Sequence, residues 1–532
     1  MANAGCCNNN GAKKHEQLQL QPHPLLEQMP DVQFCLNSPP PWTTAVLLGF
    51  QHYLLTLGSI VFIPSIIVPQ MGGGDAEKTR VIQTLLLISG LSTFLQSLFG
   101  SRLASIVGGS YAFLIPTISI IQAKRFETFK DPQERFAQTM RSIQGALIVA
   151  SCFQVIIGSL GIWRNIVRFL NPLSMVPLIT LTGLGLYNLG FPLLLKCAEV
   201  GIPQLLFMLI ISQYLPTYLK VKKPIWDRYA LLFSVAIVWV YAAILTWSGA
   251  YHKSRVDSCR VDHAGMIRKA SWIYIPFPFQ WGPPTFRAGE AIAMVVATFI
   301  ASTESTGSFL ASARYSSATP IPPSVVSRGI AWLGIGTLLN GIFGCVTGAT
   351  ATTENAGLLA LTRAGSRRIA QVSAAFMILF AILGKFGAIF ASIPMPIMGA
   401  LYCIFFGYVA SAGLGFLQFC NLNSFRTKLI LGFSLFMGLS LPQYFREYQL
   451  TNKASPIHTH SGRFNDTICI IFMSHTTIAA MVALFLDRTL PHVKDEARKD
   501  NGSQLWEKFV LYSKDCRSDE FYRLPFQLNK SN

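Results

Sequence analysis

Charged residues are scarce in this chain. Only 13% of its 532 residues are Asp, Glu, Lys or Arg, whereas 51% are hydrophobic and the mean hydropathy is +0.42. The length alone would allow several soluble domains. Apolar runs of roughly 20 residues recur from about Thr43 to Leu490, however, and each is long enough to cross a hydrocarbon core of roughly 30 Å. The sequence therefore predicts a polytopic helical membrane protein rather than a soluble one.

Sequence patterns of several enzyme and metal-binding classes are missing. No two of the 11 cysteines are spaced as CxxC, so zinc and redox sites of that kind have no support. The chain also contains no HExxH, no nucleophile elbow and no phosphate-binding loop. We therefore expect a protein that is not an enzyme and that holds no cofactor or metal.

No apolar run opens the chain. The first 41 residues are polar, and the first apolar run begins after Trp42, which is too late for a secretory signal peptide. Residues 1–41 are predicted to form a disordered tail.

The basic surplus does not indicate a nucleic-acid partner. The net charge is +18, but cytoplasmic loops of membrane proteins collect Lys and Arg. Short basic loops occur at 163–168, 220–228, 362–368 and 425–428. We expect these loops and both termini to be cytosolic. The loop at 443–467, with a glycosylation sequon at Asn465, is expected outside.

Candidate spans can be marked along the chain by apolar length. There are about fourteen, an even number that leaves both tails on one side of the membrane. They cover residues 43–68, 81–99, 104–122, 141–160, 170–191, 199–219, 227–249, 288–312, 324–346, 350–362, 369–390, 395–419, 424–442 and 468–488.

Two acidic residues fall well inside these spans, Glu304 and Glu354. A charge at the bilayer centre costs about 2.5–3.5 kcal/mol on insertion scales, so an intramembrane acid marks a functional site by default. Neither has a basic residue within one helical turn of sequence that could make it a structural ion pair. We expect both to act in function.

The surroundings of Glu354 are unusual for a membrane helix. Residues 344–357 hold four Thr and three Gly, and residues 104–120 hold a Gly-Gly-Ser and a Pro. Such stretches predict short extended pieces that lead into half-helices. Irregular backbone at membrane depth lines a cavity or lies buried in protein, and secondary transporters bind substrate at such breaks. Similar offsets, 245 residues from Ser110 to Asn355 and 253 from Gln51 to Glu304, suggest a seven-plus-seven repeat.

The stretch ENAGLLALTR at 354–363 resembles the signature of the nucleobase–ascorbate transporter family. That signature has Gln, Glu or Pro, then Asn, any residue, Gly, four of any, Thr, and Arg, Lys or Gly. The stretches ATPIPPSVVSRG and TRAGSRR resemble the plant-type branch. Matching positions are Asn355, Gly357, Thr362 and Arg363 in the signature, the pair Gln51-His52 in the first span and Glu304 in the eighth.

The resemblance implies a fold of 14 segments in two inverted seven-segment repeats, with short strands opening segments 3 and 10. It further implies elevator-like transport, in which a core domain slides against a gate domain that also forms a homodimer contact. The expected parts are the core at 42–165 and 288–392, the gate at 166–250 and 393–490, an extracellular loop at 251–287 and a cytosolic tail at 491–532.

The resemblance also implies a substrate site. Glu304 and Glu354 hold the N–H edge of a base, and backbone amides near Tyr111 and Thr353 face its carbonyls. Tyr111 packs on the ring and Asn355 orders the site. His52 supports the site, or is a satisfied core histidine. The full expected set is Gln51, His52, Ser110, Tyr111, Glu304, Ser308, Thr353, Glu354 and Asn355.

The predicted function is import of nucleobases, purines or uracil, across the plasma membrane by proton symport. Desolvation favours the neutral form of a carboxylic acid, so Glu304 and Glu354 are the candidate proton carriers. Two alternatives stay open, a sodium- or proton-coupled ascorbate transporter and an anion exchanger of the related sulfate-type fold. Ser308 and Gly334 replace titratable residues of better-known family members, which leaves the substrate undecided.

Overall fold

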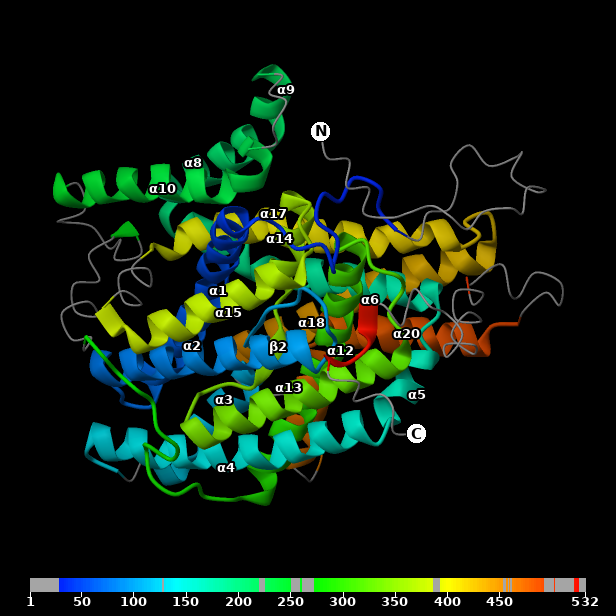
Figure 1. Cartoon of the computed structure of the whole chain (residues 1–532). Coiled ribbons are helices and arrows are strands. Elements are labelled where there is room, and N and C mark those ends of the chain that lie inside the picture. Colours follow the sequence, from blue (N-terminus) through cyan, green and yellow to red (C-terminus); the bar gives the residue numbers. More distant parts are fainter. Residues whose placement is uncertain are drawn as a thin grey trace, which may run out of the picture.

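Helices dominate the computed structural model of the chain (Figure 1). It describes residues 28–126, 129–219, 225–249, 259–260, 272–385, 393–452, 456–457, 459, 462–491, 502 and 521–525. The predicted extracellular loop and C-terminal tail therefore lie mostly outside the described residues, as does 1–27.

The first half of the chain runs from α1 to α10. Its elements are α1 (Trp42–Gln70), α2 (Asp75–Leu98), β1 (Val107–Gly109), the 3-10 turn η1 (Tyr111–Phe113), α3 (Leu114–Ile121), α4 (Pro132–Ser159), α5 (Ile162–Arg168), α6 (Pro172–Leu184), α7 (Phe191–Leu194), α8 (Ala198–Leu209), a π-helical segment (Ile210–Tyr214), α9 (Leu215–Leu219) and α10 (Ile225–Trp247).

The second half repeats the same broad order of long helices around one short strand. Its elements are α12 (Ala288–Tyr315), α13 (Pro323–Phe343), β2 (Ala349–Ala351), α14 (Thr353–Thr362), α15 (Arg367–Ile382), α17 (Met395–Leu414), α18 (Phe425–Asn452), α19 (Gly462–Phe472) and α20 (His475–Thr489).

The helical membrane architecture predicted from hydropathy is confirmed. Eight helical stretches among the described residues are long and apolar enough to cross a membrane. The remaining candidate spans overlap shorter or more polar helices, and two of them overlap a strand followed by a half-helix. Extended backbone thus occurs in the two Gly-rich and Thr-rich stretches where the sequence predicted it.

The two strands pair with each other near the middle of the molecule (Figure 1). They are antiparallel, with Val107 opposite Ala351 and Gly109 opposite Ala349. Gly108 is required here, because a Cβ at this position would lie 2.7 Å from Cγ2 of Thr352. The ribbon joins segments more than 200 residues apart in sequence, so neither half of the chain can complete it alone.

The helices pack as two bundles, each built from both halves of the chain. In the strand bundle, α1, α2 and α4 from the first half pack on α12, α13 and α15 from the second. In the flanking bundle, α6 and α8 pack on α17, and α6 also packs on α18 and α20. The bundles meet where α12 touches α6 and where α14 touches α17.

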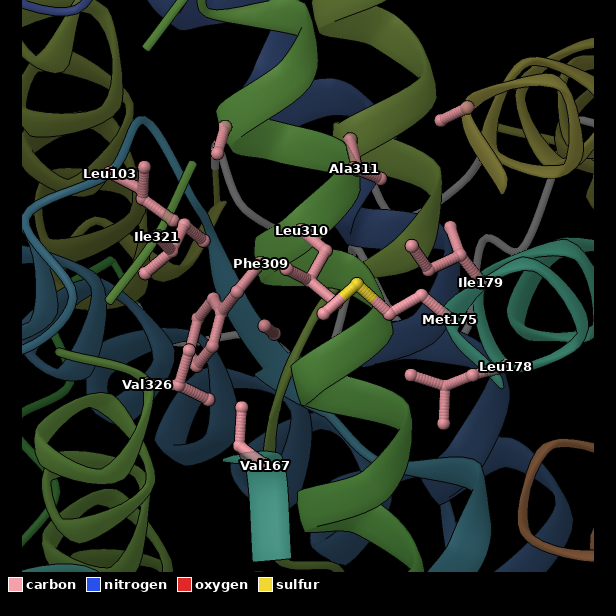
Figure 2. Close-up of a cluster of buried hydrophobic side chains, with 14 of the residues drawn as sticks. Leu103, Val167, Met175, Leu178, Ile179, Phe309, Leu310, Ala311, Ile321 and Val326 are labelled. Carbon is pink, nitrogen blue, oxygen red and sulfur yellow. The ribbon is translucent and has the colours of Figure 1, made fainter. Parts of the chain in front are cut away.

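An apolar core surrounds α12 at this meeting point. Figure 2 shows Phe309, Leu310 and Ala311 on α12, with Met175, Leu178 and Ile179 of α6 on one side and Leu103, Ile321 and Val326 of the strand bundle on the other. All nine side chains are buried. Burial of this kind removes apolar surface from water or lipid on both faces of α12, which places the helix between the bundles.

Residues 28–41 correct the prediction that the chain is disordered up to residue 41. Cys35 and Leu36 are buried, and Phe34 forms a parallel bridge with Ala364. The Gln33 N–H donates to the Arg363 carbonyl at 2.9 Å. Local composition could not predict this ordered segment, because the segment pairs with the loop after α14, which is more than 300 residues away in sequence.

A disulfide joins Cys197 to Cys259, with the two Cα atoms 5.4 Å apart. The absence of CxxC spacing in the sequence did not indicate this bond. The two cysteines are separated by 62 residues, so no local spacing could indicate the pair. The bond closes the loop that carries α8 and α10.

Glycines bring α4 and α13 into close contact. A Cβ on Gly334 would lie 2.8 Å from the backbone nitrogen of Val155, and a Cβ on Gly341 would lie 2.9 Å from Ile148 Cγ1. Small residues allow membrane helices to approach closely and to gain van der Waals contact. Gly334 is therefore a packing residue between two helices of the strand bundle.

We expect Gly334→Ala to lower the melting temperature of the purified protein in detergent. The added methyl group must push α4 from α13, and overpacking of this kind costs about 1–3 kcal/mol. Gly407→Ala on α17 is the matched control, because a Cβ there meets nothing within 4 Å. Equal melting temperatures for the two variants, measured by fluorescence-detected size exclusion after heating, would contradict this assignment.

Candidate functional site

The two half-helices begin at the ends of the β1–β2 ribbon. Residues Ser110 and Thr352 are the N-caps of η1 and α14, directly after β1 and β2. The ladder extends one bond beyond each strand, from Ser110 N–H to the Gly348 carbonyl and from Thr352 N–H to the Ile106 carbonyl. Unpaired N–H groups and the positive end of the helix dipole favour partial negative charge at such ends.

Asn355 ties the start of α14 to α1. Its Oδ1 is 2.8 Å from Nδ1 of His52, and its Nδ2 donates to Oγ1 of Thr56 and of Thr352, each at 2.8 Å. Asn355 and His52 are both almost wholly buried. The amide thus has three partners within the chain, and its role in this structure is to hold α14 against α1.

The direction of each hydrogen bond in this group follows from its neighbours. Thr56 Oγ1 donates to the His52 carbonyl at 2.7 Å, and Thr352 Oγ1 donates to the Ile106 carbonyl at 3.1 Å. Both hydroxyl oxygens are therefore free to accept from the Asn355 amide. Asn355 Oδ1 must then accept, so His52 carries its proton on Nδ1.

Glu354 lies beside this group with an unsatisfied carboxylate. The residue is 2% exposed, and its Oε1 has no hydrogen-bond partner among the described residues. The polar neighbours of the carboxylate are the Ser59 hydroxyl and the backbone N–H groups of Thr353 and Glu354 itself. A buried acceptor without a donor is costly, so this oxygen is a candidate acceptor for a ligand.

Two tyrosines bring further buried hydroxyl groups to the same place. The hydroxyl groups of Tyr111 on η1 and Tyr402 on α17 lie near each other and near the Glu354 carboxylate. Neither oxygen makes a well-formed hydrogen bond within the described part of the chain. Tyr402 was not predicted from the sequence, since nothing there distinguishes it from other aromatic residues in apolar spans. It comes from α17 of the flanking bundle, so this group of polar atoms lies between the bundles.

Glu304 lies on α12, and neighbouring hydroxyl groups of α12 bond to β2 and to the start of α14. One turn later, the Ser308 hydroxyl is 3.3 Å from Oγ1 of Thr353, and the Ser305 hydroxyl is 2.8 Å from Oγ1 of Thr350. Glu304 itself is partly exposed and has no hydrogen bond or ion pair to any described residue. The structure therefore brings Ser308 and Thr353 into contact, and no described residue pairs with the Glu304 carboxylate.

Gln51, next to His52 on α1, is bonded to a different helix. Its Nε2 donates to the Arg228 carbonyl on α10 at 3.0 Å, so it links α1 to the flanking bundle. The other signature residues have backbone roles. A Cβ on Gly357 would lie 2.2 Å from the Phe405 carbonyl oxygen of α17. The Thr362 hydroxyl donates to the Leu358 carbonyl one turn earlier in α14. Arg363 ends α14 with a left-handed φ of 50°.

A cavity of about 360 Å³ opens at the far end of α14. Residues from both bundles line it, together with part of the N-terminal segment. Among them are Leu361 in the last turn of α14, Arg363 directly after it, Tyr408 and Ser411 on α17, and Asp31. The cavity thus lies along the boundary between the bundles, on the side that carries the basic 362–368 loop.

Comparison with known proteins agrees with the signature at 354–363. The family model Xan_ur_permease, described as "Permease family", matches residues 43–447. Nucleobase-ascorbate transporters 7 and 6 of Arabidopsis thaliana are 55% and 56% identical over 514 residues, each covering 96% of this chain and 96% of the relative. Nucleobase-ascorbate transporter LPE1 of Zea mays is 50% identical over 511 residues and covers 96% of this chain and 97% of its own.

The chain belongs to the nucleobase–ascorbate transporter family. The predicted family and its plant-type branch are confirmed. Membership makes the chain a multi-pass membrane transporter with a small-molecule substrate, which agrees with its apolar helices.

Two solved structures are similar to this chain at low identity and low TM-score. The transmembrane domain of the cyanobacterial bicarbonate transporter BicA has a TM-score of 0.41 at 14% identity, covering 83% of this chain and 97% of that one. SLC26A9 has a TM-score of 0.44 at 12% identity, covering 83% and 64%.

Proposed function

We propose that this member of the nucleobase–ascorbate transporter family imports nucleobases by proton symport. The observation that carries the proposal is the convergence of three buried polar atoms, Glu354 Oε1 and the hydroxyls of Tyr111 and Tyr402, none of which makes a well-formed hydrogen bond to a described residue. Buried polar atoms are normally satisfied. A ligand that is flat and polar along its edge would satisfy all three at once.

A nucleobase has the required chemistry. Its ring N–H groups can donate to the Glu354 carboxylate, and its carbonyl oxygens can accept from the tyrosine hydroxyls and from N–H groups at the start of η1 and α14. Glu304 offers a second acceptor from α12. We propose Ser110, Thr353 and Ser308 as the hydroxyl-bearing edge, with Asn355 and His52 holding α14 in place. Gln51 is proposed to act from the neighbouring α1–α10 contact.

The rival substrates fit less well. Ascorbate at neutral pH and the substrates of a sulfate-type exchanger are anions, and two carboxylates facing the ligand would repel them. The sequence supports the same conclusion, since no basic residue lies within a turn of either acid.

We propose an elevator motion between the bundles. The strand bundle, residues 42–165 and 288–392, corresponds to a core domain that carries Glu304, Glu354 and Tyr111. The flanking bundle, residues 166–250 and 393–490, corresponds to a gate domain that contributes Tyr402. Large apolar side chains such as Ile237, Val240 and Phe436 are exposed on the gate, which supports a lipid-facing surface and a homodimer contact.

We place both termini in the cytosol and the protein in the plasma membrane. The short basic loops support this orientation. The Cys197–Cys259 disulfide supports it further, because such bonds persist on the oxidising side of a membrane. The disulfide then lies on the extracellular side, the same side to which we assign the 251–287 loop.

Uptake is expected to rise as external pH falls, because a buried acid must be protonated outside and release its proton inside. Glu304 and Glu354 are the proposed carriers. The test is the initial uptake of radiolabelled uracil, adenine, guanine, xanthine, urate and ascorbate by cells that express the chain. Each is measured over a range of external pH, with sodium replaced by choline, and with a protonophore added.

Uptake of one or more bases that survives choline and is abolished by the protonophore would support the proposal. Uptake that requires sodium and ignores both pH and protonophore would contradict proton coupling. Uptake of ascorbate alone would contradict the substrate class.

A further inference from the structure

The segment at residues 28–38 is held to the strand bundle by backbone hydrogen bonds, and we call it the N-terminal strap. The Gly365 N–H donates to the Phe34 carbonyl at 2.8 Å, and the Arg367 N–H donates to the Leu36 carbonyl at 3.0 Å. Leu36 is fully buried in the core that also contains Leu103. The strap therefore follows the loop between α14 and α15.

A second loop of the strand bundle anchors the start of the strap. Gln28 Nε2 donates to the Ser317 carbonyl at 3.0 Å, and the Ser317 hydroxyl donates to the Met29 carbonyl at 2.9 Å. Ser317 follows α12 directly. Any displacement of the strand bundle would carry the strap with it.

The strap touches the flanking bundle through a different kind of contact. The Arg228 guanidinium, near the start of α10, lies 5.1 Å from the centre of the Phe34 ring. Its backbone carbonyl also accepts the Gln51 amide from α1. A cation–π contact is weaker and less directional than the backbone pairing on the other side. Relative motion of the bundles would break this contact first.

The strap also forms one wall of the cavity between the bundles. Met29, Asp31 and Val32 line it, opposite Tyr408 and Ser411 of α17. The cavity extends from the end of α14, the half-helix that begins beside Glu354. The strap is thus placed where a substrate would leave the site for the cytosol.

We infer that the N-terminal strap is a latch between the two bundles, closed by Phe34 on Arg228 in the arrangement seen here. It moves with the strand bundle and must release Arg228 in each transport cycle. This inference rests on the elevator motion proposed above and goes beyond it, since it assigns the N-terminal segment a part in the motion.

Paired cysteines test the latch in a Cys35→Ser background, which removes the neighbouring thiol. A reducible bifunctional thiol reagent that spans the lost side chains joins Phe34→Cys to Arg228→Cys, and is expected to abolish base uptake until a reductant is added. Phe34→Cys/Ala364→Cys is the matched control, because it joins the strap to the loop it already pairs with. Its uptake is expected to survive the same treatment.

Either of two results would overturn the latch. One is normal uptake by protein that is fully cross-linked between positions 34 and 228. The other is equal arrest by the 34–364 cross-link, which would mean that any restraint on this segment stops transport.

A second measurement does not depend on the substrate. Phe34→Ala is expected to raise the labelling rate of a Ser411→Cys variant by a maleimide applied to inside-out vesicles. The increase should be about threefold, which is what loss of one cation–π contact gives a two-state population. Labelling of the parent protein, which retains Ser411, measures the reaction of the other cysteines and is subtracted. Faster labelling in a protein without base uptake would support the latch while rejecting the proposed substrate, and unchanged labelling would reject the latch.

Discussion

Glu354→Gln is expected to reduce nucleobase uptake more than tenfold. The substitution keeps the size of the side chain but replaces one acceptor oxygen with an amino group, which would face the N–H edge of a base. Hydrogen bonds to charged groups contribute about 1.5–3 kcal/mol, and each 1.4 kcal/mol is roughly tenfold in binding. The measurement is the initial uptake rate at equal amounts of protein at the cell surface.

Two further variants sharpen this result. Glu304→Gln is expected to reduce uptake as well, but by less, because Glu304 is partly exposed and Glu354 is buried with an unpartnered oxygen. Glu134→Gln on the exposed start of α4 is the control and is expected to transport normally. Normal uptake by surface-localised Glu354→Gln would remove Glu354 from both the substrate site and the proton pathway.

Asn355→Asp is expected to abolish uptake and to lower the melting temperature in detergent. The amide donates to Thr56 and Thr352 at 2.8 Å each. A carboxylate in its place has no donor, so it would face two hydroxyl oxygens with a buried negative charge. Each buried group left unsatisfied costs about 1–3 kcal/mol, and more when it is charged. Loss of both donors should separate α14 from α1 and displace Glu354.

Thr352→Ser is the matched control for this substitution. It retains the hydroxyl that accepts from Asn355, so uptake should stay close to that of the parent. Near-normal stability of Asn355→Asp would show that the His52–Asn355–Thr56 group does not hold α14. Near-normal uptake with lowered stability would separate the scaffold role of Asn355 from transport.

The strands illustrate how local composition can predict backbone. The Gly-rich and Thr-rich stretches at 104–120 and 344–357 cannot form continuous apolar helices, so the sequence alone predicted two extended breaks. It did not predict that β1 and β2 pair with each other, although it indicated a repeat. That pairing is set by contacts between segments more than 200 residues apart.

The signature motif shows how far the sequence could predict the candidate site. The sequence identified Glu354, Asn355, Gly357, Thr362 and Arg363 as a set but did not separate their roles. In the structure Gly357 leaves space for the α17 backbone, and the Asn355 side chain is hydrogen-bonded to α1. Glu354 alone among them keeps a buried oxygen without a partner. This division depends on what α1 and α17 present to each face of α14.

Hydropathy, charge placement and one signature determined that this protein is a multi-pass transporter with acids at membrane depth. These are local properties, because the cost of placing a residue in the bilayer depends mainly on that residue and its neighbours in sequence. Tertiary structure decided the rest: Tyr402 beside the Glu354 carboxylate, the Gln51 bond to α10, the disulfide and the ordered N-terminal strap. Each of these features depends on which distant segment of the chain packs against it, and the spacing of apolar residues does not specify that segment.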